Sequence, residues 1–319
     1  MKCSAFWNHT NIRAGNRVYP CCRFKSQIQT FDGNLDTVLH SDEYENLRQQ
    51  ALSGTLIKGC EKCAYEESIG HKSLRQEMND KYDMEKVELK FLEIGFDNLC
   101  NLVCDGCNSE FSTSWIVKEE ELYGKAKNKL MEIDEITSVP ITVNKILFLG
   151  GEPLITKKHL QLCSLISNPE SVELIYNTNG TFLPDDASCD VFDKFKNCKF
   201  ILSIDGYKEV NETVRYGSKW QQILDFIEWC RNKKYDLEFN TVLHKNNAHD
   251  LKNLSNFIES QERSWYINVL TYPKHLDIIN CTHEELSQLY QTVQSTDSIG
   301  NKEFIQSHIV GALHGAGKL

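Results

Sequence analysis

Three cysteines lie within eight residues of each other, in the segment C-N-L-V-C-D-G-C. Three thiolates on one short loop can hold three irons of a 4Fe-4S cluster and leave the fourth iron open, as catalytic metal sites do. Zinc is the alternative, but structural zinc sites usually use two separated cysteine pairs. The spacing therefore predicts an iron-sulfur cluster bound by Cys100, Cys104 and Cys107.

A second set of cysteines lies near the amino terminus and includes a C-x-x-C pair. Its members are Cys3, Cys21, Cys22, Cys60 and Cys63. Four of these five thiols suffice for another metal site. A four-cysteine zinc knuckle and an iron-sulfur cluster are both compatible with this spacing, which by itself favours neither.

The elements that must position these residues follow an alternating pattern from residue 89 onward. The hydrophobic periodicity predicts strands at 89–96, 145–149, 172–176, 200–204, 237–243 and 266–270, and helices at 111–136, 157–167, 185–196, 220–233 and 251–261. Such repetition is typical of a parallel sheet with right-handed crossovers. We predict an α/β fold, a partial (β/α)6 barrel with parallel strands.

Polar or glycine-containing segments stand at the ends of the predicted strands. They are D-N-L-C-N, G-G-E-P, N-T-N-G and S-I-D-G. Ligands of parallel α/β folds bind at the carboxyl ends of the strands, so these four segments are expected to converge on one site.

The chain divides into three parts by pattern. Residues 1–88 lack the βα alternation and are expected to form a small cysteine-rich module, with a hairpin around Gly15 and Asn16 and a helix near 41–52. Residues 89–281 carry the predicted barrel. Residues 282–319 are expected to form a helix followed by a loose glycine-rich tail.

Composition excludes several classes of protein. The 319 residues carry a net charge of -10, which disfavours nucleic acid as a partner. No apolar run approaches the roughly 18 residues of a membrane helix, and the first residues do not resemble a secretory signal. We expect a cytoplasmic protein without membrane contact, in which 13 cysteines point to metal ligands or reactive thiols rather than disulfides.

The C-x3-C-x2-C loop after a first strand, followed by G-G-E-P after a second, resembles the radical S-adenosylmethionine (SAM) superfamily over about residues 89–280. The resemblance implies that the open iron binds SAM and that reduction yields a 5'-deoxyadenosyl radical, which takes hydrogen from a substrate. Family members usually carry an aromatic residue before the third cysteine, where this chain has Gly106.

The resemblance also implies contacts with SAM, which we expect from residues at successive strand ends. They are Gly150, Gly151, Glu152, Pro153, Asn179, Ser203, Asp205 and Arg215. The glycines let backbone approach the methionine moiety, and a guanidinium such as that of Arg215 suits its carboxylate. The alternatives are a turn for Asn179, a helix cap for Asp205 and a surface ion pair for Arg215.

The amino-terminal segments G-x-x-V-Y-P-C-C and G-C-x-x-C are similar to the auxiliary-cluster segments of SPASM and twitch-type radical enzymes, where they usually follow the core. The similarity implies a second, auxiliary 4Fe-4S cluster. Its expected ligands are Cys3, Cys21, Cys60 and Cys63, with Cys21 preferred over Cys22 because the first cysteine of such a pair usually serves.

These features lead to a radical SAM enzyme whose substrate is expected to be a peptide or protein, with a small metabolite as the alternative. An electron donor such as flavodoxin or ferredoxin is the expected partner. From another class, a noncatalytic iron-sulfur or zinc protein also fits the cysteines. The remaining cysteines, Cys163, Cys189, Cys198, Cys230 and Cys281, are expected to be mostly packing residues, with Cys281 the one considered as a hydrogen-atom donor.

Overall fold

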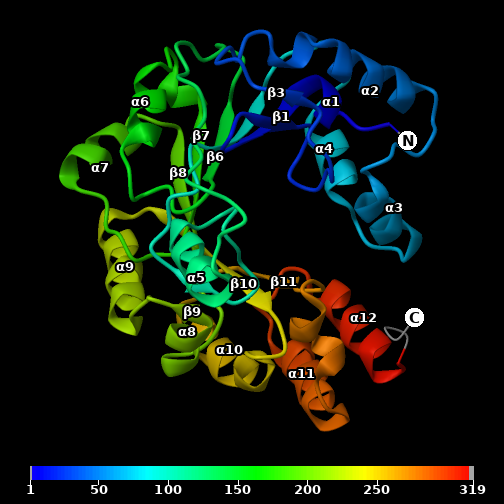
Figure 1. Cartoon of the computed structure of the whole chain (residues 1–319), viewed down its shortest axis with the longest axis vertical. Helices are drawn as coiled ribbons and strands as arrows, with labels where there is room; N and C mark the ends of the chain where they lie inside the picture. The colour runs from blue at the N-terminus through cyan, green and yellow to red at the C-terminus, as the bar shows by residue number, and fades with distance from the viewer. Residues whose placement is uncertain (1, 316–319) are drawn as a thin grey trace. The chain divides into compact units, whose positions relative to one another are not determined.

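The structure is a computed structural model that describes residues 2–315, and its backbone contacts divide the chain into two compact units (Figure 1). Unit 1 consists of Met1–Leu99, Leu130–Tyr176 and Pro184–Cys198. Unit 2 consists of Cys100–Lys129, Asn177–Leu183 and Lys199–Leu319.

Unit 1 is built on a sheet with helices between its parallel strands. Its strands are β1 (His9–Arg13), β2 (Arg17–Tyr19), β3 (Gln29–Thr30), β4 (Phe91–Gly95), β6 (Lys145–Leu149) and β7 (Glu173–Thr178, which ends in unit 2). Their order is β7-β6-β4-β1-β2-β3, with β7, β6, β4 and β1 parallel and the last two antiparallel. Its helices are α1 (Ala5–Asn8), α2 (Asp42–Leu52), α3 (Glu61–Ser68), α4 (Leu74–Lys81), α6 (Lys158–Ser164) and α7 (Asp186–Phe192), with 3-10 turns at Val38–His40 and Pro169–Ser171.

Unit 2 repeats the alternation of strand and helix. Its strands are β5 (Val103–Cys104), β8 (Asn197–Ser203, which begins in unit 1), β9 (Arg215–Tyr216), β10 (Asp236–Leu243) and β11 (Trp265–Val269). Strands β8, β10 and β11 are parallel neighbours, and β5 pairs with β9 in an antiparallel ribbon. Its helices are α5 (Thr113–Tyr123), α8 (Glu209–Val214), α9 (Trp220–Lys233), α10 (Leu251–Ser260), α11 (His283–Ser295) and α12 (Lys302–Leu313), with 3-10 turns at Ala248–Asp250, Lys274–Leu276 and Ile278–Asn280.

The predicted fold class is confirmed. All six predicted strands are present, as β4, β6 and β7 in unit 1 and as β8, β10 and β11 in unit 2. Each of these two sets follows chain order with parallel pairing, and a helix lies between most successive strands. This is the mostly parallel α/β topology of a partial (β/α)6 barrel.

One predicted helix is much shorter than expected. The pattern predicted a helix at 111–136, but α5 ends at Tyr123 because Gly124 adopts a left-handed conformation, with φ of 74°. A glycine in this conformation is a common helix terminator. The chain returns to unit 1 at Leu130, where Asp97 and Glu132 form an isolated bridge.

The first 88 residues contribute directly to the sheet of unit 1. The predicted hairpin is present between β1 and β2, with Gly15 and Asn16 both at positive φ, and the predicted helix near 41–52 is α2. Strand β1 also pairs in parallel with β4, the first predicted barrel strand. The expected domain boundary at residue 88 stays a prediction, since backbone contacts group this segment with the rest of unit 1.

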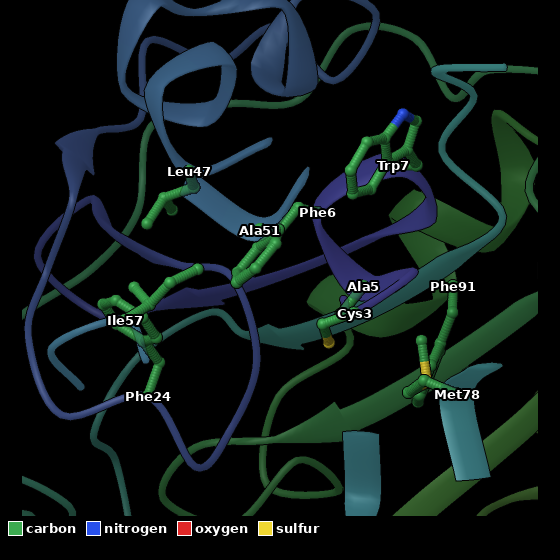
Figure 2. Packing of buried hydrophobic residues seen from close by; sticks show 10 residues of the cluster. All are labelled: Cys3, Ala5, Phe6, Trp7, Phe24, Leu47, Ala51, Ile57, Met78 and Phe91. Carbon is green, nitrogen blue, oxygen red and sulfur yellow. The ribbon is translucent and has the colours of Figure 1, made fainter. Parts of the chain in front are cut away.

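A hydrophobic cluster holds the amino-terminal segment together. Figure 2 shows Phe6, Leu47 and Ala51 gathered with Phe24 and Ile57, and the sulfur of Cys3 near Ala5. Arg48 of α2 is buried, and its Nη1 atom donates to the carbonyl oxygens of Phe6 (3.1 Å) and Leu39 (2.8 Å). Burial of the long side chain is tolerated because its charge-bearing end satisfies backbone acceptors.

The carboxyl-terminal part contains more helix than the sequence predicted. Thr282 caps α11 with a reciprocal hydrogen-bond pair to Glu285, which confirms a helix beginning there. A second helix, α12, occupies part of the segment that was expected to be a loose tail, and residues 316–319 of that tail lie outside the described residues. Within residues 2–315 no helix is long and apolar enough to cross a membrane.

Alternate residues of the barrel strands differ in burial. In β8, Cys198, Phe200 and Leu202 are buried, whereas the residues between them are half-buried, and β6 and β10 show the same alternation. Strands of parallel sheets are usually buried on both faces. The second face of these strands is therefore less completely buried than the first.

We predict that replacing Phe148 of β6 will strongly destabilise unit 1. Phe148 is fully buried and stacks on Tyr176, with ring centroids 4.6 Å apart. F148A should lower the free energy of unfolding by about 3–5 kcal/mol, because it removes apolar contact and leaves a cavity, and F148L should cost much less. Denaturant titration followed by circular dichroism measures both, and equal losses for the two variants would contradict the packing described.

Candidate functional site

The three cysteines of the predicted core cluster lie on one loop of unit 2 whose backbone is fixed at several points. The carbonyl oxygen of Cys100 accepts hydrogen bonds from the Thr113 hydroxyl (3.1 Å) and from the Ser114 backbone N–H (3.3 Å), in the first turn of α5. The Cys107 N–H donates to the carbonyl oxygen of Cys104 (3.2 Å). The three side chains are half-buried, and the loop presents its thiols from a rigid backbone.

Burial favours the neutral form of two thiols of this loop. Burial raises the pKa of Cys104 to about 12 and that of Cys107 to about 11, and each thiol also lies within electrostatic reach of Cys100. Metal ligands must be thiolates, so cluster binding releases protons and is linked to pH.

Gly106 is required by the local geometry. Its φ of 75° is left-handed, and an added Cβ atom would lie 2.7 Å from Cδ2 of Leu270. The left-handed φ disfavours residues other than glycine, and an aromatic side chain here, usual in the family that the motif resembles, would also require Leu270 to shift.

Asn179 lies beside the cysteine loop with its amide orientation fixed. Its Oδ1 atom accepts from the backbone N–H (2.9 Å) and the hydroxyl (2.7 Å) of Thr181. The Nδ2 atom therefore points the other way, to Oδ1 of Asn101 (3.1 Å) and to Sγ of Cys100 (3.9 Å). Its predicted contact with SAM stays a prediction.

Arg215 and Asp205 form a buried ion pair, with 2.7 Å between Nη1 and Oδ2. The pair is in contact with the cysteine loop, because Arg215 lies opposite Cys104 in the ribbon of β5 and β9. Burial opposes the charge of Arg215, but Cys104 and Asp205 hold its pKa above the ordinary arginine value. The sequence alternatives of a surface ion pair for Arg215 and a helix cap for Asp205 are both wrong, since the pair is buried and Asp205 caps no described helix.

Ser203 ends β8 on the less buried face of unit 2. Its hydroxyl donates to Oδ1 of Asn177 at 3.4 Å, a long bond that leaves the hydroxyl able to bind another group. The structure thus brings Asn179, Asp205 and Arg215 to the cysteine loop. Ser203, the fourth residue of unit 2 predicted to contact SAM, lies at the end of β8.

The glycine segment belongs to unit 1, where it approaches the residues just before the cysteine loop. Gly151 N–H donates to the carbonyl oxygen of Asp97 (3.1 Å), and Glu152 N–H donates to that of Leu99 (2.8 Å). A Cβ atom on Gly151 would lie 2.1 Å from the Leu99 oxygen, and one on Gly150 would lie 2.7 Å from the Asp97 oxygen. Only glycine permits this approach.

Glu152 and Pro153 complete the segment and are buried. The Glu152 carboxylate accepts from the Leu154 N–H (3.1 Å), which closes a local turn. Asp97 and Lys158 were not among the predicted site residues. They form an ion pair of 2.9 Å that also holds the segment preceding the cysteine loop. The only sequence signal for Asp97 was its place in the strand-end segment D-N-L-C-N.

The amino-terminal cysteines meet around one cavity of unit 1. Cys3, Cys21, Cys60 and Cys63 all line it, together with apolar residues such as Phe24 and Met78 and the cations Arg23 and Arg75. Burial raises the pKa of Cys3 to about 11 and that of Cys60 to about 12. A donor set of four thiols suits either a zinc ion or an iron-sulfur cluster whose irons are all bound by protein.

Cys22 does not line this cavity. Its backbone carbonyl accepts from Nη2 of Arg13 (3.2 Å), and its thiol faces the buried carboxylate of Glu93. Within residues 2–315 no group of three or more His, Cys, Asp or Glu side chains is arranged to chelate a single metal ion.

The remaining cysteines are mostly buried packing residues, as predicted. Cys163, Cys189, Cys198 and Cys230 are buried, and Cys281 is half-buried.

Three kinds of comparison relate the chain to known proteins. The radical SAM superfamily sequence model matches residues 96–258. GTP 3',8-cyclase of Clostridium perfringens (strain SM101 / Type A) is 30% identical over 190 residues, which cover 56% of this chain and 54% of that protein. S-adenosylmethionine-dependent nucleotide dehydratase of Lacinutrix mariniflava is 27% identical over 238 residues, 66% of this chain and 46% of that protein.

Among solved structures, native anSMEcpe with bound AdoMet matches at 15% identity and a TM-score of 0.45, over 63% of this chain and 58% of that one. The chain spans about half the length of the curated relatives it matches.

The family match begins at the end of β4 and runs through α10, so it contains the cysteine loop, the glycine segment and the Asp205–Arg215 pair. Membership in this family implies a 4Fe-4S cluster and SAM as cofactors. The three-thiol loop has the donor set for that cluster. The chain belongs to the radical SAM superfamily of enzymes.

Proposed function

We propose that this enzyme cleaves SAM reductively at a cluster held by Cys100, Cys104 and Cys107, and that the resulting radical removes hydrogen from a substrate. When bound, the cluster supplies one electron, which breaks the bond between sulfur and C5' of SAM to give methionine and a 5'-deoxyadenosyl radical. The observation that carries the proposal is the three-thiol loop fixed to α5, because it leaves a cubane cluster with one open iron.

Several of the residues predicted to contact SAM carry groups that suit an amino-acid ligand. The glycine segment of unit 1 is held with its backbone close to residues 97–99, where its polar groups can bind the amine of SAM. Ser203 and Arg215 of unit 2 carry a hydroxyl and a guanidinium for the carboxylate.

We further propose a second, auxiliary 4Fe-4S cluster bound by Cys3, Cys21, Cys60 and Cys63. The four thiols line one cavity, whereas Cys22 is turned toward Glu93, which supports the choice of Cys21. Four thiolates leave no iron open, so this cluster would transfer electrons rather than bind substrate. Flavodoxin or ferredoxin is the class of external donor.

For the substrate we favour a small phosphorylated metabolite over a peptide. Both curated relatives named above act on nucleotides by name, and the end of β1 offers a guanidinium suited to phosphate. Arg13 is held there by Oδ1 of Asn11 (3.0 Å) and by the ring of Tyr19, 4.1 Å from its centre. A peptide or protein remains the second candidate, supported by the paired cysteine sets typical of such modifying enzymes.

The cysteine loop can be tested by removing its thiols. C100A/C104A/C107A should abolish formation of 5'-deoxyadenosine from SAM and dithionite, and iron should fall from about eight to about four per chain. Chromatography of the products and iron analysis after anaerobic reconstitution measure both. Cleavage of SAM by the triple variant would refute the assignment of the core cluster.

The adjacent cysteines Cys21 and Cys22 provide a test of the auxiliary site and its matched control. C60A/C63A and C21A should each lose about four irons, whereas C22A should keep the wild-type iron content, because its thiol lies outside the cavity. Metal analysis should find iron and not zinc at this site. One equivalent of zinc bound by the wild-type chain, or loss of iron in C22A but not C21A, would contradict the proposed ligands.

A further inference from the structure

Arg215 has a buried hydrogen-bond donor that no described residue satisfies. Its Nη1 atom binds Asp205, but its Nε atom is inaccessible and has no hydrogen-bond partner in residues 2–315. An unpaired guanidinium N–H in the interior costs free energy, so such a group marks a missing acceptor, which a neutral thiol supplies only weakly and a thiolate supplies well.

The neighbours of Arg215 are the thiols of the cysteine loop. Arg215 is the direct partner of Cys104 in the β5–β9 ribbon, which is extended by a 2.7 Å bond from Asp105 N–H to the carbonyl oxygen of Val214. Side chains of directly opposed residues lie on the same face, with Cβ atoms about 4.5–5.5 Å apart.

Asp205 fixes the position of this guanidinium. One carboxylate oxygen binds Arg215, and the other accepts from the backbone N–H of Val242 (2.7 Å). The backbone of Asp205 is held at both ends, because its N–H donates to Asn211 (2.9 Å) and its carbonyl accepts from Asn247 (2.8 Å). A carboxylate with both oxygens engaged holds the arginine fork in one orientation.

Asn179 provides a second oriented donor. Because Thr181 occupies its Oδ1 atom with two hydrogen bonds, the amide nitrogen must face the loop, where it lies 3.9 Å from Sγ of Cys100. This distance is within the range of a hydrogen bond to sulfur. Two of the three core cysteines thus have a donor residue beside them from outside the loop, Asn179 at Cys100 and Arg215 opposite Cys104.

We propose that Arg215 and Asn179 are tuning groups of the core cluster, which donate to its thiolate sulfurs and raise its reduction potential. Reduction adds negative charge to the cluster, and hydrogen bonds and a nearby cation stabilise that charge. The inference rests on the proposed function, since it requires a cluster at the triad. It assigns these residues a role on the cluster in addition to any contact with SAM.

The test is a redox titration of the reconstituted full chain without SAM, followed by electron paramagnetic resonance. C100A/C104A/C107A identifies the auxiliary signal, so the remaining component is the core cluster. R215Q should lower the equilibrium constant for one-electron reduction of the core cluster at least tenfold, or about 59 mV. R215K, which keeps the charge but not the fork, and N179A should each give a smaller decrease in the same direction.

A matched control is R231Q, which removes an exposed arginine of α9 whose side chain donates to Gln261 (3.1 Å) and should leave the potential unchanged. If R215Q does not assemble a cluster, R215K and N179A decide the outcome. Wild-type potentials in variants with full iron content would overturn the inference, even if R215Q binds SAM more weakly. Absence of a 4Fe-4S signal at the triad of the wild-type chain would instead refute the proposed function, and this inference with it.

Discussion

The close approach of two backbone segments in unit 1 determines where the cysteine loop begins. Gly150 and Gly151 pack against residues 95–99 at distances that no side chain permits, and two hydrogen bonds join the segments. Since Leu99 directly precedes Cys100, this contact fixes the backbone entry to the loop. Asp97 contributes twice, because its carbonyl binds Gly151 and its carboxylate binds Lys158 and the Leu99 N–H (3.1 Å). The glycines therefore have a structural role in addition to any contact with SAM.

A second constraint is the unequal burial of the two strand faces. The helix-facing positions, such as Phe148 in β6 and Phe200 in β8, are fully buried and provide the apolar packing that stabilises the units. The alternate positions include polar side chains such as Ser203 and Asn240 that a packed core would exclude. Residues that alternate along a strand therefore have different roles: those on the buried face stabilise the fold, and those on the other face can serve function. Substitutions on the first face should change stability, and those on the second should change activity.

The sequence predicted most of the fold because its strands carry strong local signals. Apolar runs ending in glycine or polar residues marked β4, β6 and β8 to within a few residues. The length of α5 was overestimated because the pattern continued beyond Gly124, whose left-handed conformation ends the helix. Pairing of β1 with β4 was not foreseen, since a short strand far from its partner along the chain leaves no periodic signal.

The site residues were identified from motif spacing, but their relations to each other were not. The sequence named Asp205 and Arg215 separately, whereas the structure joins them as one buried pair beside Cys104. Hydrogen bonds between residues distant in sequence, such as Asp205 with Val242, depend on strand register, which no single sequence specifies by pattern alone. Asp97 was missed for the same reason, because its partner Lys158 lies on another element.

The two sets of thiols differ in a way that indicates a division of labour. The amino-terminal four line a largely apolar cavity, and their number would let a cluster there have every iron bound by protein. The loop of three lies at strand ends beside polar groups and leaves one iron for an outside ligand. A cluster in apolar surroundings with all its irons bound by protein suits electron transfer, because little around it has to reorganise. A cluster with an open iron near fixed hydrogen-bond donors suits chemistry on a bound ligand. The difference follows from ligand count and surroundings, and it does not depend on the identity of the substrate.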